Sequence, residues 1–364
     1  MILANLFAMA WLAPTAHACV ALVTTDGGAV ATSDAQQVIL ETTSTGTAVE
    51  YANSYTGTAD DFGWIIVVPA PFESMADGDL ERFSRLTDRS QPRIEVMSYG
   101  SSGDDAGGCG CGGAAQSKSA AGAAPGAFGD SGLNDVSVVA EGFTGTYDYT
   151  VVESDDPDGL VTWLEANDWV LGANEAALTE YVNEGGFSFV LVELSTEAPL
   201  ASGESGLLPP VRIESGSSEL MFPARMARDA APEFQSTRIF VLGDEKAELT
   251  GAWSSVTLDW IDAGGDDPDA AFEDALWEAT GDSATYAQVF SGRTDDGWLT
   301  RFETRADRDV HTADVIVALS GGRSPSEVVV QSWSRSTAPV SGAYGAGLVV
   351  LLLPLLSFMR ARRD

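Results

Sequence analysis

Short runs of hydrophobic residues, rich in Val, Ile and aromatic residues, recur along most of the chain. Such runs between turn residues are typical of strands. Gly, Pro, Asn, Asp and Ser separate the runs and mark turns. The pattern predicts strands at 19–25, 38–43, 62–68, 187–194, 211–213, 238–242, 253–262, 288–291, 298–304 and 315–319, and a strand pair over 136–152.

Four other segments have hydrophobic residues at helical spacing, namely 77–86, 157–166, 174–183 and 268–279. These helices do not alternate one for one with the strands, so a regular parallel sheet is not favoured. We therefore predict the α+β class: a body with a mixed or mostly antiparallel sheet and a few helices, plus one C-terminal transmembrane helix.

The N-terminal segment is apolar from residue 2 to 13 and ends in the small-residue pattern Ala16-His17-Ala18. This pattern predicts a signal peptide over residues 1–18 that is cleaved before Cys19, although no Lys or Arg precedes the apolar run. Acylation of Cys19, as in a lipoprotein, is the alternative.

Residues 342–359 carry no charge and are followed at once by Arg360, Arg362 and Arg363. Eighteen residues in a helix reach about 27 Å, which is enough to cross the bilayer core. We expect a transmembrane helix with a basic cytoplasmic tail, 360–364, and the body outside the cytoplasm, in the periplasm or at the cell surface. A buried core helix and a sorting signal that is cleaved remain alternatives.

Two low-complexity stretches divide the exported part. Residues 100–132 are dominated by Gly, Ala and Ser, with cysteines among them, and read as a linker or insert between body segments 19–99 and 133–319. Residues 320–341 are rich in Ser, Gly and Pro and read as a spacer to the membrane, although Val328-Val329-Val330 could form a short strand.

The chain is strongly acidic, with 54 Asp and Glu against 19 Lys and Arg and a formal net charge of −35. Such a surface repels phosphate backbones, which argues against nucleic acid as a partner. It also argues against electrostatic docking on anionic lipid. Two interpretations of the acidity stay open: solubility in salt, and binding of divalent cations.

Cys19, Cys109 and Cys111 are the three cysteines, and they are disulfide candidates in an oxidising compartment. Because there are three cysteines, one disulfide would leave one cysteine with a free thiol. Redox or metal use of these cysteines is the alternative.

Two similar acidic segments precede apolar helical patterns, and calcium binding by clustered carboxylates is one interpretation of them. Helix capping, with Asp at the N-cap, Pro at the first helical position and Asp in the first turn, is the competing and stronger interpretation. The weak metal candidates are Asp155, Asp156, Asp158, Asp266, Asp267 and Asp269. We expect no other cofactor.

Enzyme signatures are missing: the chain has no Gly-x-Ser-x-Gly elbow, no His-Glu-x-x-His and no phosphate loop. We name no catalytic residue. Asp309 and Asp314 could orient the imidazole of His311, but no motif supplies a nucleophile, and we expect His311 at the surface. The tryptophans could stack on sugars, although core packing is the expected role.

Several motifs resemble a bacterial family of exported proteins, the domain of unknown function 2330. The motifs are DFGWIIVVPAP at 61–71, LVTWLEAN at 160–167, LPPVRI at 208–213 with Phe222-Pro223, and WLTR at 298–301. The resemblance covers most of residues 19–319 and implies a signal peptide, a Gly- and Cys-rich insert and a C-terminal anchor. It implies no activity. The chain departs from the family in lacking a second cysteine close to Cys19.

These features together predict an extracytoplasmic protein tethered to a membrane through its C-terminal helix. We expect a binding or structural role, with an envelope protein or polymer as partner. A carboxylate-dependent envelope hydrolase and a calcium-binding surface protein remain alternatives. The sequence does not decide whether the protein is an enzyme, although the missing motifs favour a non-enzyme.

Overall fold

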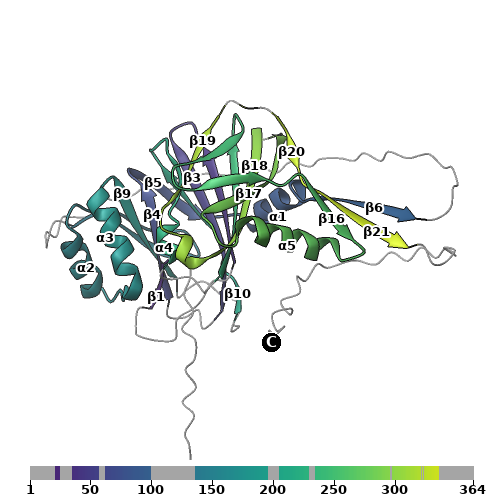
Figure 1. The fold of residues 1–364 in the computed structure, drawn as a ribbon. Coiled ribbons are helices and arrows are strands. Elements are labelled where there is room, and N and C mark those ends of the chain that lie inside the picture. Colours follow the sequence, from purple (N-terminus) through teal and green to yellow (C-terminus); the bar gives the residue numbers. More distant parts are fainter. Residues whose placement is uncertain are drawn as a thin grey trace, which may run out of the picture.

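The computed structural model describes residues 21–24, 35–56, 62–99, 136–195, 205–228, 234–295, 297–320, 322 and 324–335 (Figure 1). The predicted signal peptide, the insert, the three cysteines and the segment 342–359 lie outside these residues. Within them, no helix is long and apolar enough to cross a membrane.

The largest sheet has ten strands and is mixed. Its central order is β15-β17-β18-β13-β2-β3-β11-β5, with β10 on β3 and β20 on β17. The pairs β13–β2 and β15–β17 are parallel, and the other pairs of this sheet are antiparallel. Its strands are β2 (Ala35–Thr42), β3 (Thr47–Thr56), β5 (Phe72–Asp77), β10 (Ser205–Leu207), β11 (Val211–Ser215), β13 (Phe234–Gly243), β15 (Ser254–Thr257), β17 (Thr285–Thr294), β18 (Gly297–Asp307) and β20 (Ser326–Glu327).

A second, five-stranded sheet is antiparallel, in the order β1-β4-β9-β8-β7. Its strands are β1 (Ala21–Thr24), β4 (Phe62–Pro69), β7 (Val136–Phe143), β8 (Tyr147–Ser154) and β9 (Phe187–Leu194). Helices α2 (Pro157–Ala166) and α3 (Glu175–Glu184) cover its outer face, at the left end of the molecule in Figure 1.

Two three-stranded sheets complete the fold. One contains β12 (Leu220–Phe222), β19 (Val315–Leu319) and β14 (Ala247–Thr250). The other contains β16 (Trp260–Gly264), β21 (Val329–Arg335) and β6 (Arg93–Tyr99), all parallel, and its strands β6 and β21 project beyond the body at the right of Figure 1. The remaining helices are α1 (Leu80–Arg89), α4 (Arg225–Arg228), α5 (Pro268–Thr280) and the 3-10 turns Gly172–Asn174 and Arg308–Val310.

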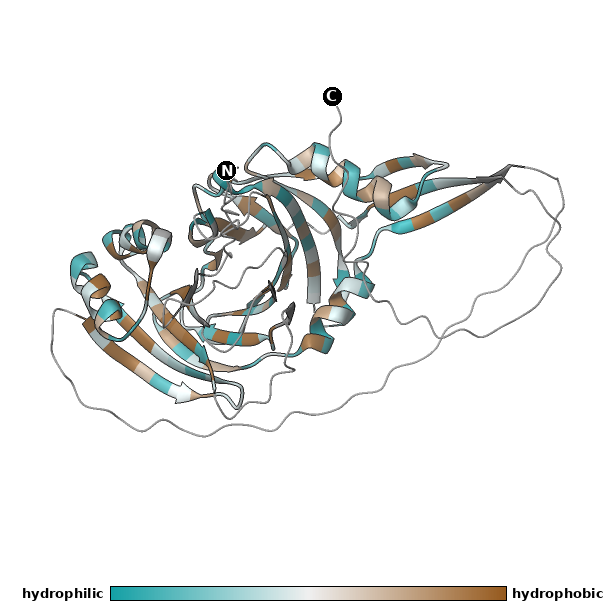
Figure 2. Ribbon diagram, turned by 90° about the horizontal axis from the view of Figure 1, so that it is seen from below, coloured by the Kyte–Doolittle hydropathy of each residue, from teal (hydrophilic) through white to brown (hydrophobic). Residues whose placement is uncertain are grey.

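The main core lies between the two large sheets. Figure 2 shows hydrophobic positions along the strands of both sheets. The inward residues include Val38 and Ile239 from one sheet and Trp64, Ile66 and Val190 from the other, all at most 1% exposed. A second core packs α2 and α3 on the outer face of the five-stranded sheet. The five-stranded sheet is therefore buried on both faces over most of its area.

The predicted α+β class with mixed or mostly antiparallel sheets is confirmed. The helix 157–166 and the strand 187–194 have the predicted bounds. The single strand at 253–262 is wrong, because β15 and β16 lie there in different sheets. The spacer expected at 320–341 is wrong in part, because β20 and β21 pair with β17, β16 and β6.

Candidate functional site: an acidic groove on the five-stranded sheet

A groove of about 400 Å³ lies between the C-terminal end of α2 and strands β7, β8 and β9. We call it the acidic groove. It is lined by Glu141, Gly142, Asp148, Tyr149, Thr150, Trp163, Asn167, Trp169, Leu191 and Glu193. None of these ten residues is basic, and three are acidic.

Strand register brings the three acidic residues to one face. Asp148 on β8 is directly opposite Glu193 on β9, and Glu141 on β7 is opposite Thr150, two positions along β8 from Asp148. Directly opposite residues, and residues two apart on one strand, point to the same side of a sheet. In the described part of the chain, none of the three carboxylates forms an ion pair with a base.

The surroundings of Glu193 shift the pKa of its side chain. Partial burial and, after it, the charge of Asp148 raise the pKa of Glu193 above the usual value for a glutamate. Like charges directly opposite on neighbouring strands destabilise a sheet. The fold thus places two carboxylates, those of Asp148 and Glu193, opposite each other on the side of the groove formed by the sheet.

Local sequence positions the aromatic side of the groove. Helix α2 ends at Asn167, whose Nδ2 donates to the carbonyl oxygen of Trp163 at 2.7 Å. Asp168 then adopts a left-handed conformation with φ of 65°, which Asp tolerates better than most residues. The Trp169 amide donates to the carbonyl oxygen of Leu164 at 2.9 Å, so the chain turns back toward the sheet.

The indole of Trp169 packs over Gly63 on β4. A Cβ atom at Gly63 would lie 2.6 Å from the ring of Trp169, so glycine is required for this contact. Trp169 is 6% exposed and Trp163, one helical turn before Asn167, is half-buried. The ring of Trp169 is therefore fixed by its packing against β4.

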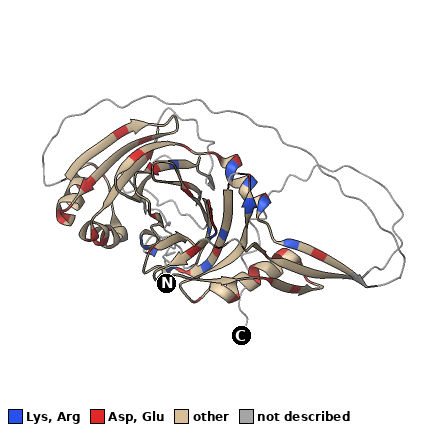
Figure 3. Ribbon diagram, turned by 90° about the horizontal axis from the view of Figure 1, so that it is seen from above, with Lys and Arg blue, Asp and Glu red and all other residues tan. Residues whose placement is uncertain are grey.

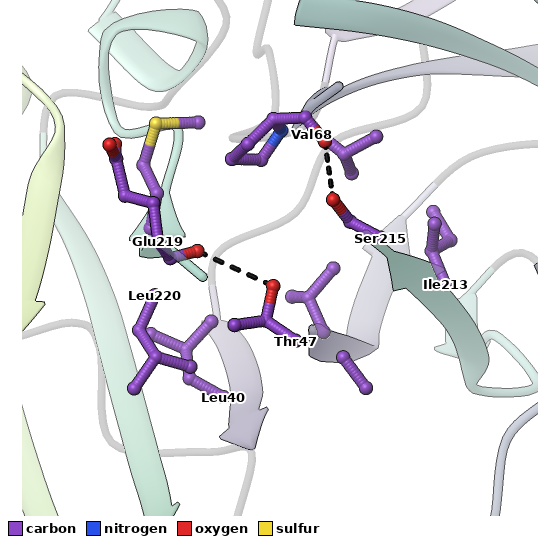
Figure 4. A pocket seen from close by; sticks show the side chains of 11 residues that line it. Leu40, Thr47, Val68, Ile213, Ser215, Glu219 and Leu220 are labelled. Atoms are coloured by element: carbon purple, nitrogen blue, oxygen red, sulfur yellow. Dashed lines mark hydrogen bonds between the residues drawn. The ribbon is translucent and has the colours of Figure 1, made fainter. Parts of the chain in front are cut away.

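A second cavity, in the main core, is far smaller. A cavity between β2, β3, β11 and β12 is lined by residues such as Leu40, Val68 and Leu220 (Figure 4). Thr47 and Ser215 at its rim are already satisfied, since they donate to the carbonyl oxygens of Glu219 and Pro69. Its free volume of about 10 Å³ is close to the minimum for a single water.

The two acidic segments lie at helix starts. Asp156 accepts from the amide of Asp158, and Asp267 accepts from the amides of Asp269 and Ala270. The capping interpretation is confirmed at both helices, with Pro157 and Pro268 at the first helical positions. Asp155 and Asp266 are exposed beside the caps. Across the described ranges, no three His, Cys, Asp or Glu side chains come together as metal ligands.

The surface location expected for His311 is wrong. His311 is 0% exposed and its ring lies 5.3 Å from that of Trp253, so it belongs to the core around β17. Burial lowers the pKa of its imidazole. Asp309 is 85% exposed and Asp314 binds Arg225, so neither orients the ring; its Nδ1 lies 3.2 Å from the carbonyl oxygen of Arg308.

Sequence analysis did not find the residues of the acidic groove. Glu141, Asp148 and Glu193 occupy polar positions of alternating strands, which is the pattern of ordinary solvent-facing residues. Of the residues that line the groove, Trp163 and Asn167 lie in the LVTWLEAN motif that the sequence analysis singled out. The acids come together through strand pairing, which the alternation alone does not encode.

Comparisons with known proteins give a family and no activity. Among solved structures, the chain is similar to the crystal structure of baculovirus P35, at 9% identity over 82% of this chain and 97% of that chain, with a TM-score of 0.31. That likeness is too low to support an argument. No curated protein matches the chain. Residues 13–309 match the family described as "Uncharacterized protein conserved in bacteria (DUF2330)". Because the match extends over most of the chain, the protein belongs to this bacterial family of uncharacterized proteins.

Proposed function

We propose that this protein is an exported, membrane-tethered binding protein whose acidic groove holds a cationic group, an ammonium or guanidinium, of an envelope ligand. The export and the tether rest on the apolar segments 2–13 and 342–359. The groove carries the binding proposal, because three carboxylates and two tryptophans line it without any base.

Cation recognition follows from the chemistry of these side chains. Tryptophan is the strongest partner for a cation over an aromatic face, and carboxylates supply charge-assisted acceptors. A phosphate or carboxylate ligand would meet only repulsion there. A neutral sugar could stack on the rings, but it would leave the acidic pair of Asp148 and Glu193 uncompensated.

A matched pair of small ligands tests this function. We expect arginine amide to bind the full chain in nanodiscs and citrulline amide, its uncharged analogue, not to bind, as measured by isothermal titration calorimetry. The Trp163→Ala variant should weaken binding by about 2- to 30-fold, the range expected for one cation–aromatic contact. The exposed Trp260 lies on β16, outside the groove, so Trp260→Ala is the control. Equal binding of both amides would refute the cationic ligand.

The Glu193→Gln variant is expected to raise the melting temperature and to weaken binding of the ligand. A raised folded-state pKa means that folding becomes less favourable as pH rises through it, so removing the charge should stabilise the protein at pH 7. We expect a melting temperature higher by about 1–2 °C, because an exposed like-charge pair costs at most about 1 kcal/mol. This gain in melting temperature should vanish below the ordinary glutamate pKa, because Glu193 is then protonated in the wild type as well. Differential scanning calorimetry at pH 7 and pH 4 gives both values, and the same variant should bind arginine amide more weakly.

A carboxylate-dependent envelope hydrolase is the second candidate. The adjacent acids Asp148 and Glu193, one with a raised pKa, are the observation that favours it. Release of fragments from envelope glycan or peptide by the full chain, lost in Asp148→Asn and in Glu193→Gln, would replace the binding proposal. Binding of arginine amide without any such release would leave binding as the function.

A further inference from the structure

Strands β6 and β21 form a projecting ribbon whose outer part exposes hydrophobic side chains. Ile94, Val96 and Met97 on β6 are 48%, 61% and 44% exposed. β6 is an edge strand, since the order in this sheet is β16-β21-β6. Figure 1 shows both strands running side by side away from the body to a common tip. We call the segments 96–99 and 332–335 the ribbon tip.

Helix α5 covers only the base of this sheet. Ile261 and Val330 pack with Phe272 and Leu276 of α5 and are nearly fully buried. Ile94 is the register partner of Val330 but lies at the edge and remains half exposed, and Val96, two residues further out, is the most exposed of the three. The apolar surface of the ribbon tip is therefore not covered by any part of the chain that the structure describes.

The charge of the ribbon tip differs from that of the rest of the molecule. Segments 96–99 and 332–335 contain no acid and one base, Arg335, in a chain of net charge −35, and the nearest contacting acid is Asp262 on β16, which accepts from Nε1 of Trp333 at 3.0 Å. Figure 3 shows acidic residues distributed over the strands and helices of the body. Most of the body would be repelled by an anionic lipid surface, whereas the ribbon tip would not.

The position of the ribbon tip along the chain indicates what covers it. β21 ends at Arg335, and six residues, 336–341, separate it from the apolar segment 342–359. Seven extended steps reach at most about 25 Å. The end of β21 must therefore lie within that distance of the point where the proposed anchor enters the bilayer. Trp333 and Tyr99 at the ribbon tip are residue types enriched at membrane interfaces.

We propose that the ribbon tip rests on the bilayer surface from which the anchor emerges, with Val96 and Met97 in contact with lipid. This inference depends on the tether of the proposed function. The membrane contact would orient the molecule, because α2 and α3 lie at the opposite end of the body (Figure 1) and the C-terminal end of α2 lines the acidic groove. The groove would then face away from the lipid, toward the envelope ligand.

Photocrosslinking in vesicles tests this contact. The full chain, with p-benzoylphenylalanine in place of Val96, is reconstituted in vesicles of phosphatidylethanolamine and phosphatidylglycerol that contain an alkyne-tagged lipid. The control carries the photoreactive residue in place of Phe143, which is 54% exposed and lies on β7, the edge strand of the five-stranded sheet. We expect lipid adducts at position 96 that are at least several-fold more abundant than at position 143.

Resistance of the protein to extraction by alkaline carbonate is measured first in the same vesicles. A chain that resists extraction but forms no lipid adduct at position 96, or forms adducts with a second copy of the chain instead, overturns the ribbon contact and leaves the tether intact. A chain that is extracted has no tether, and then both the tether and the ribbon contact are wrong.

Discussion

Replacing Glu303 with Gln is expected to lower the free energy of unfolding by about 3–5 kcal/mol, the cost of breaking a buried ion pair. Glu303 on β18 accepts from Arg238 on β13 and from Arg301, whose Nη2 lies 2.6 Å from Oε1. The side chains of Arg301 and Glu303 are 3% and 5% exposed. Glutamine keeps the shape and removes the charge, so two guanidinium groups would lose their counter-ion.

The pH dependence of this variant has a definite sign. Burial alone would raise the pKa of Glu303, but Arg238 and Arg301 outweigh burial and hold the pKa below its ordinary value. Ionised Glu303 therefore contributes stability above the unfolded-state pKa of about 4.5, and this contribution is lost as pH falls through the lower folded-state pKa. The difference between wild type and Glu303→Gln should shrink in that window.

Urea denaturation of the chain truncated after Val340 measures this effect. Glu327→Gln is the matched control, because Glu327 accepts from Arg93 at 2.9 Å while both side chains are about half exposed. Exposed pairs contribute little to stability. Similar losses of unfolding free energy in Glu303→Gln and in Glu327→Gln would mean that the buried ion pair stabilises the protein no more than the exposed one.

The second large effect is expected for Asp314→Asn, which should cost about 2–3 kcal/mol. Asp314 precedes β19 and accepts from Nη2 of Arg225 at 2.8 Å and from the hydroxyl of Tyr181 on α3. Arg225 lies over the ring of Tyr181, 4.1 Å from its centre, and also donates two hydrogen bonds to Glu184. Because Glu184 remains as a counter-ion, the loss should be smaller than for Glu303.

A second acid beside Arg225, Glu180, provides the control for Asp314→Asn. Glu180 is 48% exposed and lies 3.6 Å from Nη1 of Arg225, so Glu180→Gln should change the unfolding free energy by less than about 1 kcal/mol. Asp314 connects α3 and α4 to β19, and hydrogen exchange in α3 should accelerate in Asp314→Asn but not in Glu180→Gln. Unchanged exchange in α3 would show that this cluster does not hold the helix in place.

Local chemistry determined the elements with strong short-range signals. Asp156 and Pro157 start α2, Asp267 and Pro268 start α5, and the apolar run of β9 is long enough to identify a buried strand. Each of these signals acts between residues a few positions apart, so it can be read from the sequence. The α+β class could also be predicted from the sequence, because the predicted helices do not alternate one for one with the predicted strands.

Only the tertiary structure decided which distant segments meet. β21 pairs with β6 across more than 230 positions, and Asp148 lies opposite Glu193 because β8 and β9 pair in one particular register. A shift of one residue would move an acid to the other face of the sheet, and nothing in the alternation of either strand encodes that choice. His311 shows the same limit: no motif pairs it with a nucleophile, so it was expected at the surface, while packing against Trp253 buries it. The sequence by itself thus determined the fold class, several helices and strands, the acidity and the apolar segments of this protein, whereas the acidic groove and the ribbon exist only through non-local strand pairing.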